Sequence, residues 1–416
     1  MTDSSDTRRA FPRAFLARAV AFPTPRRRYP RNFGMAALLV ALLPAHVGAA
    51  VAAEARPDGP ALERAHSFLD NGDFDSAIAA CAEAIRLTPG DPNAYMVRGL
   101  AYARKGDLTK AISDLSEAVR IDPWNEQALS RRGTVYSRMG RHEDAVADLT
   151  AAIRLDPKDA FAFLNRGLVY VTKGDAGRGL ADLTESIRLN PQSPSAFYLR
   201  GLANVRRGEF DKAIADLGEA VRLDPNRVEN FGERGMAFVA KRQFDRAISD
   251  FTEAIRLDPR SWLAFANRGN AYLMKGDPGR AVEDYGDAIR INPGDAMLYY
   301  NRGNGYLTSG DYAKAIADYN EAVRINPRDA LAYYNRGNFY LRRDDDDKAI
   351  RDFTEAIRIR PTFADCYYGR AVAYRSKGEN AKAAEDFAQA ERLGYKPGDG
   401  AGEPGRAGGG CRLGEP

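Results

Sequence analysis

The sequence repeats a short phrase whose side chains can each make several hydrogen bonds. YYNRGNGY spans residues 299–306 and YYNRGNFY spans residues 333–340, while a looser version, FANRGNAY, spans residues 265–272. Successive copies lie 34 residues apart. An Asn amide both donates and accepts hydrogen bonds, and Tyr adds a rigid ring with a polar hydroxyl. These residue types, repeated at a regular spacing, suit the recognition of a polar and repetitive ligand better than they suit covalent chemistry.

Residues that commonly catalyse reactions or bind metals are scarce. The chain has three His and three Cys; His66 and His142 stand alone, and His46 lies in an apolar segment. The sequence contains neither a Gly-rich phosphate loop nor a paired-Cys motif. The acidic run DDDDK at residues 344–348 is expected to begin a helix, where negative charge stabilises the N-terminus, rather than to bind a metal. We therefore expect no catalytic site, no metal site and no cofactor.

The distribution of charge argues against a nucleic-acid partner. The net charge is +4, but residues 1–57 carry nine Arg against three acidic residues and account for +6, so the remainder carries −2. A nucleic-acid-binding domain is expected to present a basic stripe on its folded part. The remainder of this chain has no such excess of positive charge.

The N-terminal residues 1–57 form a basic extension that contains an apolar segment. Residues 34–53 lack Asp, Glu, Lys and Arg, and an apolar run, Met35–Leu43, precedes Ala-x-Ala sequences. This order is typical of an export signal and predicts a periplasmic or extracytoplasmic protein. The alternative is a membrane anchor, because 20 uncharged residues can just span a bilayer. Translation from Met35 would explain the long preceding segment but would leave the signal without its positive flank.

The middle of the chain is a tandem array with a period of 34 residues. We number the positions within a repeat so that the recurring proline is position 32, which gives ten repeats over residues 58–397. Position 8 is Gly in eight repeats, positions 20 and 27 are each Ala in nine, and positions 4 and 11 are aromatic in eight and nine. The prolines that define the period are at 89, 123, 157, 191, 225, 259, 293, 327 and 361.

This pattern of aromatic, Gly, Tyr, Ala and Pro resembles the tetratricopeptide repeat. One departure is that the family's usual Leu at position 7 is Arg in all ten repeats. The resemblance implies an all-α fold of tandem helix-turn-helix repeats, stacked into a right-handed α-solenoid superhelix with a concave groove. Residues 398–416 are Gly-rich and are expected to form a flexible tail.

The residues themselves support two antiparallel helices in each repeat. Positions 4, 8 and 11 share one face of the first helix, and the Gly between two aromatic residues lets the second helix approach closely. The second helix contributes small residues at positions 20 and 27 and a larger apolar one at position 24. Asp or Ser at position 34 is expected to cap the next helix, and Gly at position 15 to end the first helix.

Charged residues recur at two positions in nearly every repeat, which favours a structural role for them. Position 7 is Arg in ten repeats and position 23 is Asp in nine. We expect each such Arg to pair with the Asp of its own repeat, as in Arg302 and Asp318. An Arg stem can lie along apolar surface while its head stays polar.

Positions 2, 5, 6, 9 and 13 lie on the opposite face of the first helix, which lines the groove in the family resembled. Here these positions vary between repeats, and Asn and Tyr predominate in the second half of the chain. A row of Asn amides can bind the repeating N–H and C=O groups of an extended peptide. The row is similar to that of the repeat region of O-linked N-acetylglucosamine transferases; the alternative is that the amides are hydrated by-products of repeat duplication. The candidate peptide-binding residues are Asn165, Asn267, Asn270, Tyr300, Asn301, Asn304, Tyr334, Asn335, Asn338 and Tyr368.

The first half of the array carries charged residues at the same positions. This suggests either a groove end that favours acidic ligand segments or a hydrated face. The residues concerned are Arg104, Arg131, Arg138, Arg206, Glu63 and Glu233.

Together these features predict a non-catalytic scaffold that binds an extended peptide or a partner protein. The alternatives are a structural component of an envelope or secretion assembly that acts through its outer faces, and a regulatory subunit of an enzyme. A role in binding chaperone C-termini is not expected, because the Lys that such family members carry at position 5 is absent from every repeat.

Overall fold

The computed structural model describes residues 57–395, and every regular element within that range is an α-helix. These residues divide into two compact units, an N-terminal unit of residues 57–242 and a C-terminal unit of residues 243–395. The division falls within the sixth repeat. The predicted export segment at 34–53, the Gly-rich tail at 398–416 and the third cysteine, Cys411, lie outside the described residues.

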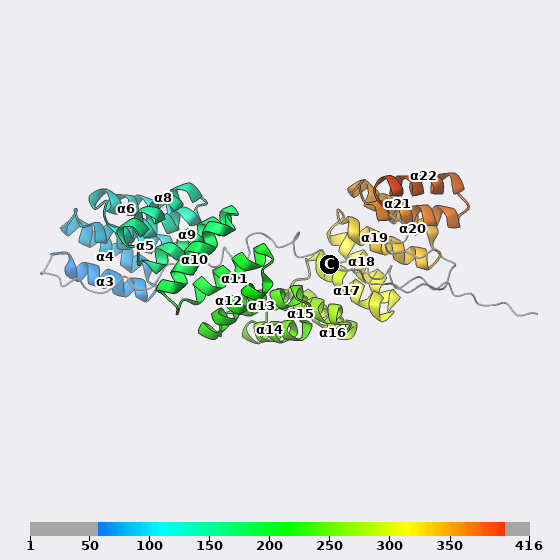
Figure 1. Cartoon of the computed structure of the whole chain (residues 1–416), viewed down its shortest axis with the longest axis horizontal. Coiled ribbons are helices and arrows are strands. Elements are labelled where there is room, and N and C mark those ends of the chain that lie inside the picture. Colours follow the sequence, from blue (N-terminus) through cyan, green and yellow to red (C-terminus); the bar gives the residue numbers. More distant parts are fainter. Residues whose placement is uncertain (1–56, 396–416) are drawn as a thin grey trace, which may run out of the picture. The chain divides into compact units, whose positions relative to one another are not determined.

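The N-terminal unit consists of five helix pairs and the first helix of the sixth repeat. Consecutive helices pack against each other along the chain, as expected for a helix-turn-helix array (Figure 1). The helices are α3 (Gly59–Asp70), α4 (Phe74–Leu87), α5 (Pro92–Lys105), α6 (Leu108–Ile121), α7 (Glu126–Arg138), α8 (His142–Leu155), α9 (Ala160–Lys173), α10 (Ala176–Leu189), α11 (Pro194–Arg207), α12 (Phe210–Leu223) and α13 (Val228–Ala240).

The C-terminal unit contains the second helix of the sixth repeat and four further helix pairs. Its helices are α14 (Phe244–Leu257), α15 (Trp262–Lys275), α16 (Pro278–Ile291), α17 (Ala296–Ser309), α18 (Tyr312–Ile325), α19 (Ala330–Arg342), α20 (Asp346–Ile359), α21 (Ala364–Ser376) and α22 (Asn380–Arg392). The acidic run at 344–348 begins α20, as predicted, and Asp345 caps that helix by accepting from the Lys348 amide.

The helix ends follow the predicted chemistry. Asp159 at position 34 accepts hydrogen bonds from the amides of Phe161 and Ala162 and thereby caps α9. All eight Gly residues at position 15 adopt the left-handed conformation that glycine tolerates best. The other two repeats force Arg242 and Asp344 into the same conformation, with φ of 57° and 56°.

Glycine at position 8 lets the two helices of a repeat approach closely, as expected. A β-carbon at Gly303 would lie 2.9 Å from the ring of Tyr319 and 3.4 Å from the carbonyl oxygen of Ala315. The first of these distances is too short for ordinary carbon–carbon contact. The ring at position 24 therefore fills the space that a side chain at position 8 would need.

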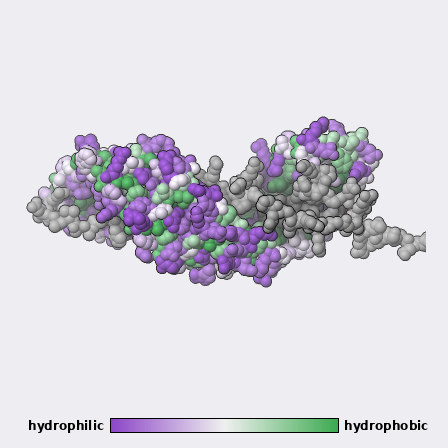
Figure 2. Space-filling model, viewed as in Figure 1, coloured by the Kyte–Doolittle hydropathy of each residue, from purple (hydrophilic) through white to green (hydrophobic). Residues whose placement is uncertain are grey.

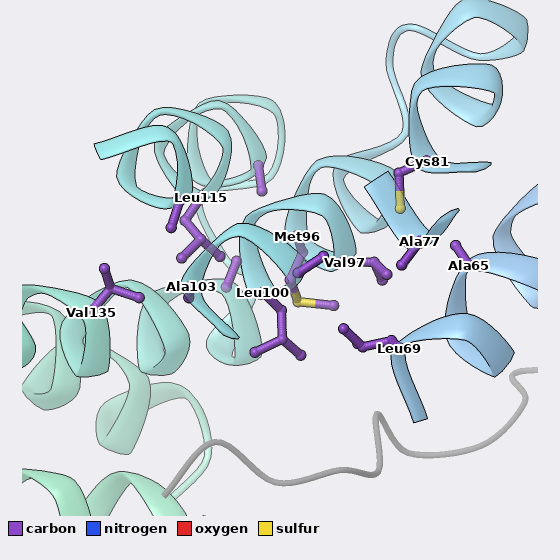
Figure 3. Packing of buried hydrophobic residues seen from close by; sticks show 14 of the residues in the cluster. Ala65, Leu69, Ala77, Cys81, Met96, Val97, Leu100, Ala103, Leu115 and Val135 are labelled. Carbon is purple, nitrogen blue, oxygen red and sulfur yellow. The ribbon is translucent and has the colours of Figure 1, made fainter. Parts of the chain in front are cut away.

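Stacking of successive repeats creates apolar clusters that neighbouring repeats share. In the N-terminal unit, side chains from α3 to α7 converge on a cluster that includes Leu69, Met96, Leu100 and Leu115 (Figure 3). Each of these four residues is at most 3% exposed. The core thus joins helices of different repeats, and no repeat encloses its own apolar face alone.

The predicted pairing of position 7 with position 23 is confirmed in eight repeats. Arg302, for example, donates from Nε and Nη2 to the two carboxylate oxygens of Asp318 at 2.8 and 2.7 Å. The bidentate pairs are Arg98–Asp114, Arg132–Asp148, Arg166–Asp182, Arg200–Asp216, Arg268–Asp284, Arg302–Asp318, Arg336–Asp352 and Arg370–Asp386.

The same arginines also link neighbouring repeats. Arg166 donates from Nη1 to the Thr150 hydroxyl at 3.1 Å, and Thr150 is at position 25 of the preceding repeat. Arg370 bonds Thr354 in the same way at 3.0 Å. In these repeats the Arg at position 7 therefore joins the two helices of its own repeat and also bonds the preceding repeat. The first repeat has Ala80 at position 23, and its Arg64 bonds Glu83 instead.

The face of the described residues seen in Figure 2 is largely polar. Hydrophilic residues cover most of the coloured area on the face shown in Figure 2. Within residues 57–395, none of the helices combines the length and the apolar character required to cross a bilayer.

Candidate functional site

The Asn and Tyr residues of the eighth and ninth repeats are brought together by two first helices. α17 carries Tyr300, Asn301 and Asn304 on one face, because Asn304 follows the other two by four and three positions and residues at these spacings lie close on a helix. α19 carries the equivalent residues Tyr334, Asn335 and Asn338. Each of the six residues is at most 8% exposed.

Hydrogen bonds join Tyr300, Asn304 and Asn335 to one another and to Tyr319 of α18. The Tyr319 hydroxyl, from α18, donates to the Asn304 amide oxygen at 2.7 Å. The Asn335 amide nitrogen donates to the same oxygen at 3.2 Å and to the Tyr300 hydroxyl at 2.9 Å. We call Tyr300, Asn304, Tyr319, Tyr334, Asn335 and Asn338 the amide cluster. Asn304 therefore serves as an internal acceptor that links three helices, and its oxygen is already committed to the fold.

The bond between the Tyr at position 24 and the Asn at position 9 is also present in the seventh repeat. Tyr285 donates from its hydroxyl to the Asn270 amide oxygen at 2.7 Å. Burial raises the pKa of the Tyr285 and Tyr319 hydroxyls well above the usual range. Both hydroxyls therefore stay protonated and remain donors throughout the physiological pH range.

Asn338 differs from its equivalents because the ninth repeat has Phe353 at position 24, where the previous two repeats have Tyr. Without that hydroxyl, neither the nitrogen nor the oxygen of the enclosed Asn338 amide makes a hydrogen bond of ordinary geometry. The Tyr334 hydroxyl interacts with this amide through a weak side-chain hydrogen bond, which opposes the rise that burial causes in the pKa of Tyr334. Asn338 therefore keeps hydrogen-bonding capacity that the fold uses only weakly.

The other predicted site residues lie outside this cluster. Asn165, in the N-terminal unit, donates to the Phe161 carbonyl of its own helix at 2.8 Å. Asn267 is half-buried. Tyr368 is half-buried and stacks on Tyr395, with ring centroids 4.3 Å apart. The predicted row of ten residues is thus not one uniform set of amides and rings.

Three arginines of the N-terminal unit bind backbone rather than form a hydrated face. Arg104 donates to the Leu69 carbonyl at 3.2 Å, and Arg138 donates to the Ala103 carbonyl at 2.7 Å. Arg206 bonds the equivalent carbonyl of Val171 at 2.8 Å. Each guanidinium reaches the last turn of the preceding first helix, where positive charge is stabilising. In each case an Arg at position 13 bonds the carbonyl of position 12 in the preceding repeat. An Arg at position 13 is therefore the feature of the sequence that could have predicted this bond.

Glu233 is the most perturbed carboxyl on the first helices of this unit. Burial raises its pKa to about 7, Arg206 opposes the rise, and Glu229 adds to it. Its ionisation therefore falls within the physiological pH range.

Groups with metal-binding or nucleophilic chemistry do not gather in the described part of the chain. Within residues 57–395, no three His, Cys, Asp or Glu side chains are placed to hold a metal ion. Cys81 and Cys366 are buried, and burial raises the pKa of the Cys81 thiol to about 12. A thiol with such a pKa stays protonated at neutral pH and is a poor nucleophile.

Comparison with known protein families finds the tetratricopeptide repeat along most of the array. One pattern described as tetratricopeptide repeat matches residues 62–125, 164–228, 233–296 and 347–394, which is more than half of the chain. Two related patterns match residues 138–174 and 303–344, and residues 330–363. Among curated proteins, no similar sequence was found.

Several solved structures resemble the chain. YrrB, described as a TPR protein with an unusual peptide-binding site, is 27% identical; the match covers 44% of this chain and 94% of YrrB, with a TM-score of 0.40. A tetratricopeptide repeat protein from Parabacteroides merdae is 20% identical over 60% of this chain and 98% of its own, with a TM-score of 0.44. Yeast Tom70 is 16% identical over 82% of this chain and 92% of its own, with a TM-score of 0.40.

Proposed function

Since the chain belongs to the tetratricopeptide repeat family, whose members generally mediate protein–protein interaction, we propose that it is a non-catalytic scaffold for an extended peptide segment of a partner protein. The peptide binds at the amide cluster of the C-terminal unit. Its backbone is recognised there by side-chain amides and its side chains by the adjacent Tyr rings.

The observation that carries this proposal is the enclosed amide of Asn338, neither atom of which makes a hydrogen bond of ordinary geometry. Enclosed polar groups are nearly always hydrogen-bonded, and leaving one without a partner costs about 1–3 kcal/mol. An Asn amide needs one acceptor and one donor, and a peptide unit offers a C=O and an N–H. A bound peptide strand would therefore satisfy both atoms of Asn338 at once.

The residues one helical turn before Asn338 on α19, Tyr334 and Asn335, are held in place by packing and hydrogen bonds, which supports the same role. Tyr334 packs against Phe353 and Phe363, with ring centroids 6.2 and 5.0 Å apart. The neighbouring amide of Asn335 is held by Tyr300 and Asn304. A binding group supported by such contacts loses little side-chain entropy when a ligand binds.

Selection from a random peptide display library on the full chain tests the proposal. The counter-selection uses a variant in which Asn301, Asn335 and Asn338 are all replaced by Ala, with circular dichroism to confirm that it stays helical. We expect peptides enriched on the wild-type protein to lose binding to the variant. Equal enrichment on both proteins would exclude the amide cluster and favour binding through the outer faces.

We also propose that residues 34–53 direct the protein out of the cytoplasm. The support is the basic flank, the apolar run and the small residues that follow it. Cell fractionation with N-terminal sequencing tests this proposal. A full-length chain in the soluble cytosolic fraction would contradict both export and anchoring.

A further inference from the structure

One charged side chain of the N-terminal unit is enclosed without an ionic partner. Arg131, at position 6 on α7, is 6% exposed. Its Nε and Nη1 atoms are enclosed and have no hydrogen-bond partner, and the hydroxyl of the adjacent Ser130 is likewise enclosed and unpaired. The third guanidinium nitrogen, Nη2, is not one of these enclosed and unpaired atoms. Such an arrangement is costly, because an enclosed charge normally requires a partner.

The charged groups around Arg131 do not neutralise it. Arg104 repels it and is itself bonded to the Leu69 carbonyl. Asp159 attracts it, but its Oδ1 accepts from the two amides that begin α9. His66, on α3, adds no negative charge, and burial lowers its pKa. Asp70 attracts Arg104 and His66, which leaves Asp159 as the acidic group that attracts Arg131 itself.

We propose that Arg131 is the binding site for a carboxylate on an acidic side chain of the bound partner segment. The assignment rests on the proposed function and extends it to the N-terminal unit. Arg offers donors in a rigid fork that fits two carboxylate oxygens, as the eight Arg–Asp pairs of this chain already show. The Ser130 hydroxyl supplies a further donor on the adjacent residue.

A carboxylate fits this site better than a phosphate does. One guanidinium has to be neutralised, and Asp159 already supplies negative charge nearby. A carboxylate brings a single negative charge, whereas a phosphate group brings about 1.5 to 2 at neutral pH. The second charge of a phosphate would be repelled by Asp159.

Fluorescence anisotropy on the full chain tests this inference. The probe is a short peptide of alternating Ala and Glu, acetylated, amidated and labelled, and its counterpart has Gln in place of Glu. We expect the Glu peptide to bind more tightly than the Gln peptide. Arg131→Gln should weaken that binding about ten- to hundredfold, the range expected for hydrogen bonds to a charged group. Arg131→Lys should weaken it less, because the charge remains while the fork is lost.

Arg154→Gln is the matched control. It removes an exposed Arg from α8 in the same unit and should leave the affinity unchanged. Equal binding of the two peptides, an equal loss in the Arg154 and Arg131 variants, or an unchanged affinity in the Arg131 variants would overturn the inference. Stronger competition by inorganic phosphate than by acetate would also overturn it. A negative result for Arg131 would not contradict the proposal of peptide binding at the amide cluster, because the triple Asn variant tests the C-terminal unit separately.

Discussion

The hydroxyl of Tyr319 donates a 2.7 Å hydrogen bond to the amide oxygen of Asn304 and so joins the two helices of the eighth repeat. Tyr285 and Asn270 make the same bond in the seventh repeat. In the ninth repeat, Phe353 has no hydroxyl to offer Asn338. The residue at position 24 therefore decides whether the amide at position 9 stabilises the fold or stays available to a ligand.

Removal of the Tyr319 hydroxyl is expected to loosen its repeat. In Tyr319→Phe, Asn304 loses one of its two donors, which should cost about 1 kcal/mol. The loss should appear as faster hydrogen exchange in α17 and α18. Tyr312→Phe is the control, because Tyr312 lies on the same helix and is 45% exposed. Identical exchange in the two variants would mean that the bond to Asn304 contributes nothing.

Addition of a hydroxyl at position 24 of the ninth repeat is expected to weaken peptide binding. In Phe353→Tyr, the new hydroxyl can donate to the Asn338 oxygen, as Tyr319 does to Asn304. A peptide would then have to displace that bond, so affinity for a selected peptide should fall severalfold while the helix content stays the same. Phe251→Tyr is the control, since Met236 stands at position 9 of its repeat. Undiminished affinity in Phe353→Tyr would argue that Asn338 does not touch the peptide.

The close helix approach at Gly303 predicts opposite effects for two glycine substitutions. Gly303→Ala places a methyl group 2.9 Å from the Tyr319 ring and should destabilise the unit by about 1–3 kcal/mol. Gly286→Ala, in α16, has only the tip of Arg302 nearby, at 3.9 Å. It should be neutral or stabilise by up to about 1 kcal/mol, because Ala favours helices. Thermal unfolding monitored by circular dichroism distinguishes the two, and equal melting temperatures would refute the packing argument.

The raised pKa of Glu233 predicts a specific pH dependence. The native state keeps the Glu233 proton at pH values where the unfolded chain has lost it, so the free energy of unfolding should fall as the pH rises from about 4.5 to about 7. Glu233→Gln should remove this slope. Chemical unfolding of the wild type and the variant at several pH values measures it. Glu117→Gln serves as the control, because the pKa of Glu117 is lowered by Arg120 and gives no slope in that window. If the free energy of unfolding still fell over this pH range in Glu233→Gln, another titrating group would be responsible for the pH dependence.

The helix caps, the close helix contacts and the ion pairs within each repeat could be predicted from the sequence. The caps at position 34, the glycines at positions 8 and 15 and the Arg–Asp pairs follow from the helical period and from repetition in every unit. The use of Asn304 could not be foreseen, because it depends jointly on Tyr319 in the second helix and Asn335 in the next repeat. The arginines at position 13 likewise looked like surface charge, since their carbonyl partners belong to the backbone of another repeat.

The most direct test of peptide binding at the amide cluster is calorimetric titration of a selected peptide into Asn338→Ala and Asn380→Ala. Asn380 lies exposed on α22 and is a residue of the same type in the same unit. Asn338→Ala should weaken binding about tenfold or more, as expected for the loss of two hydrogen bonds, while Asn380→Ala should match the wild type. Wild-type affinity in Asn338→Ala would contradict the account.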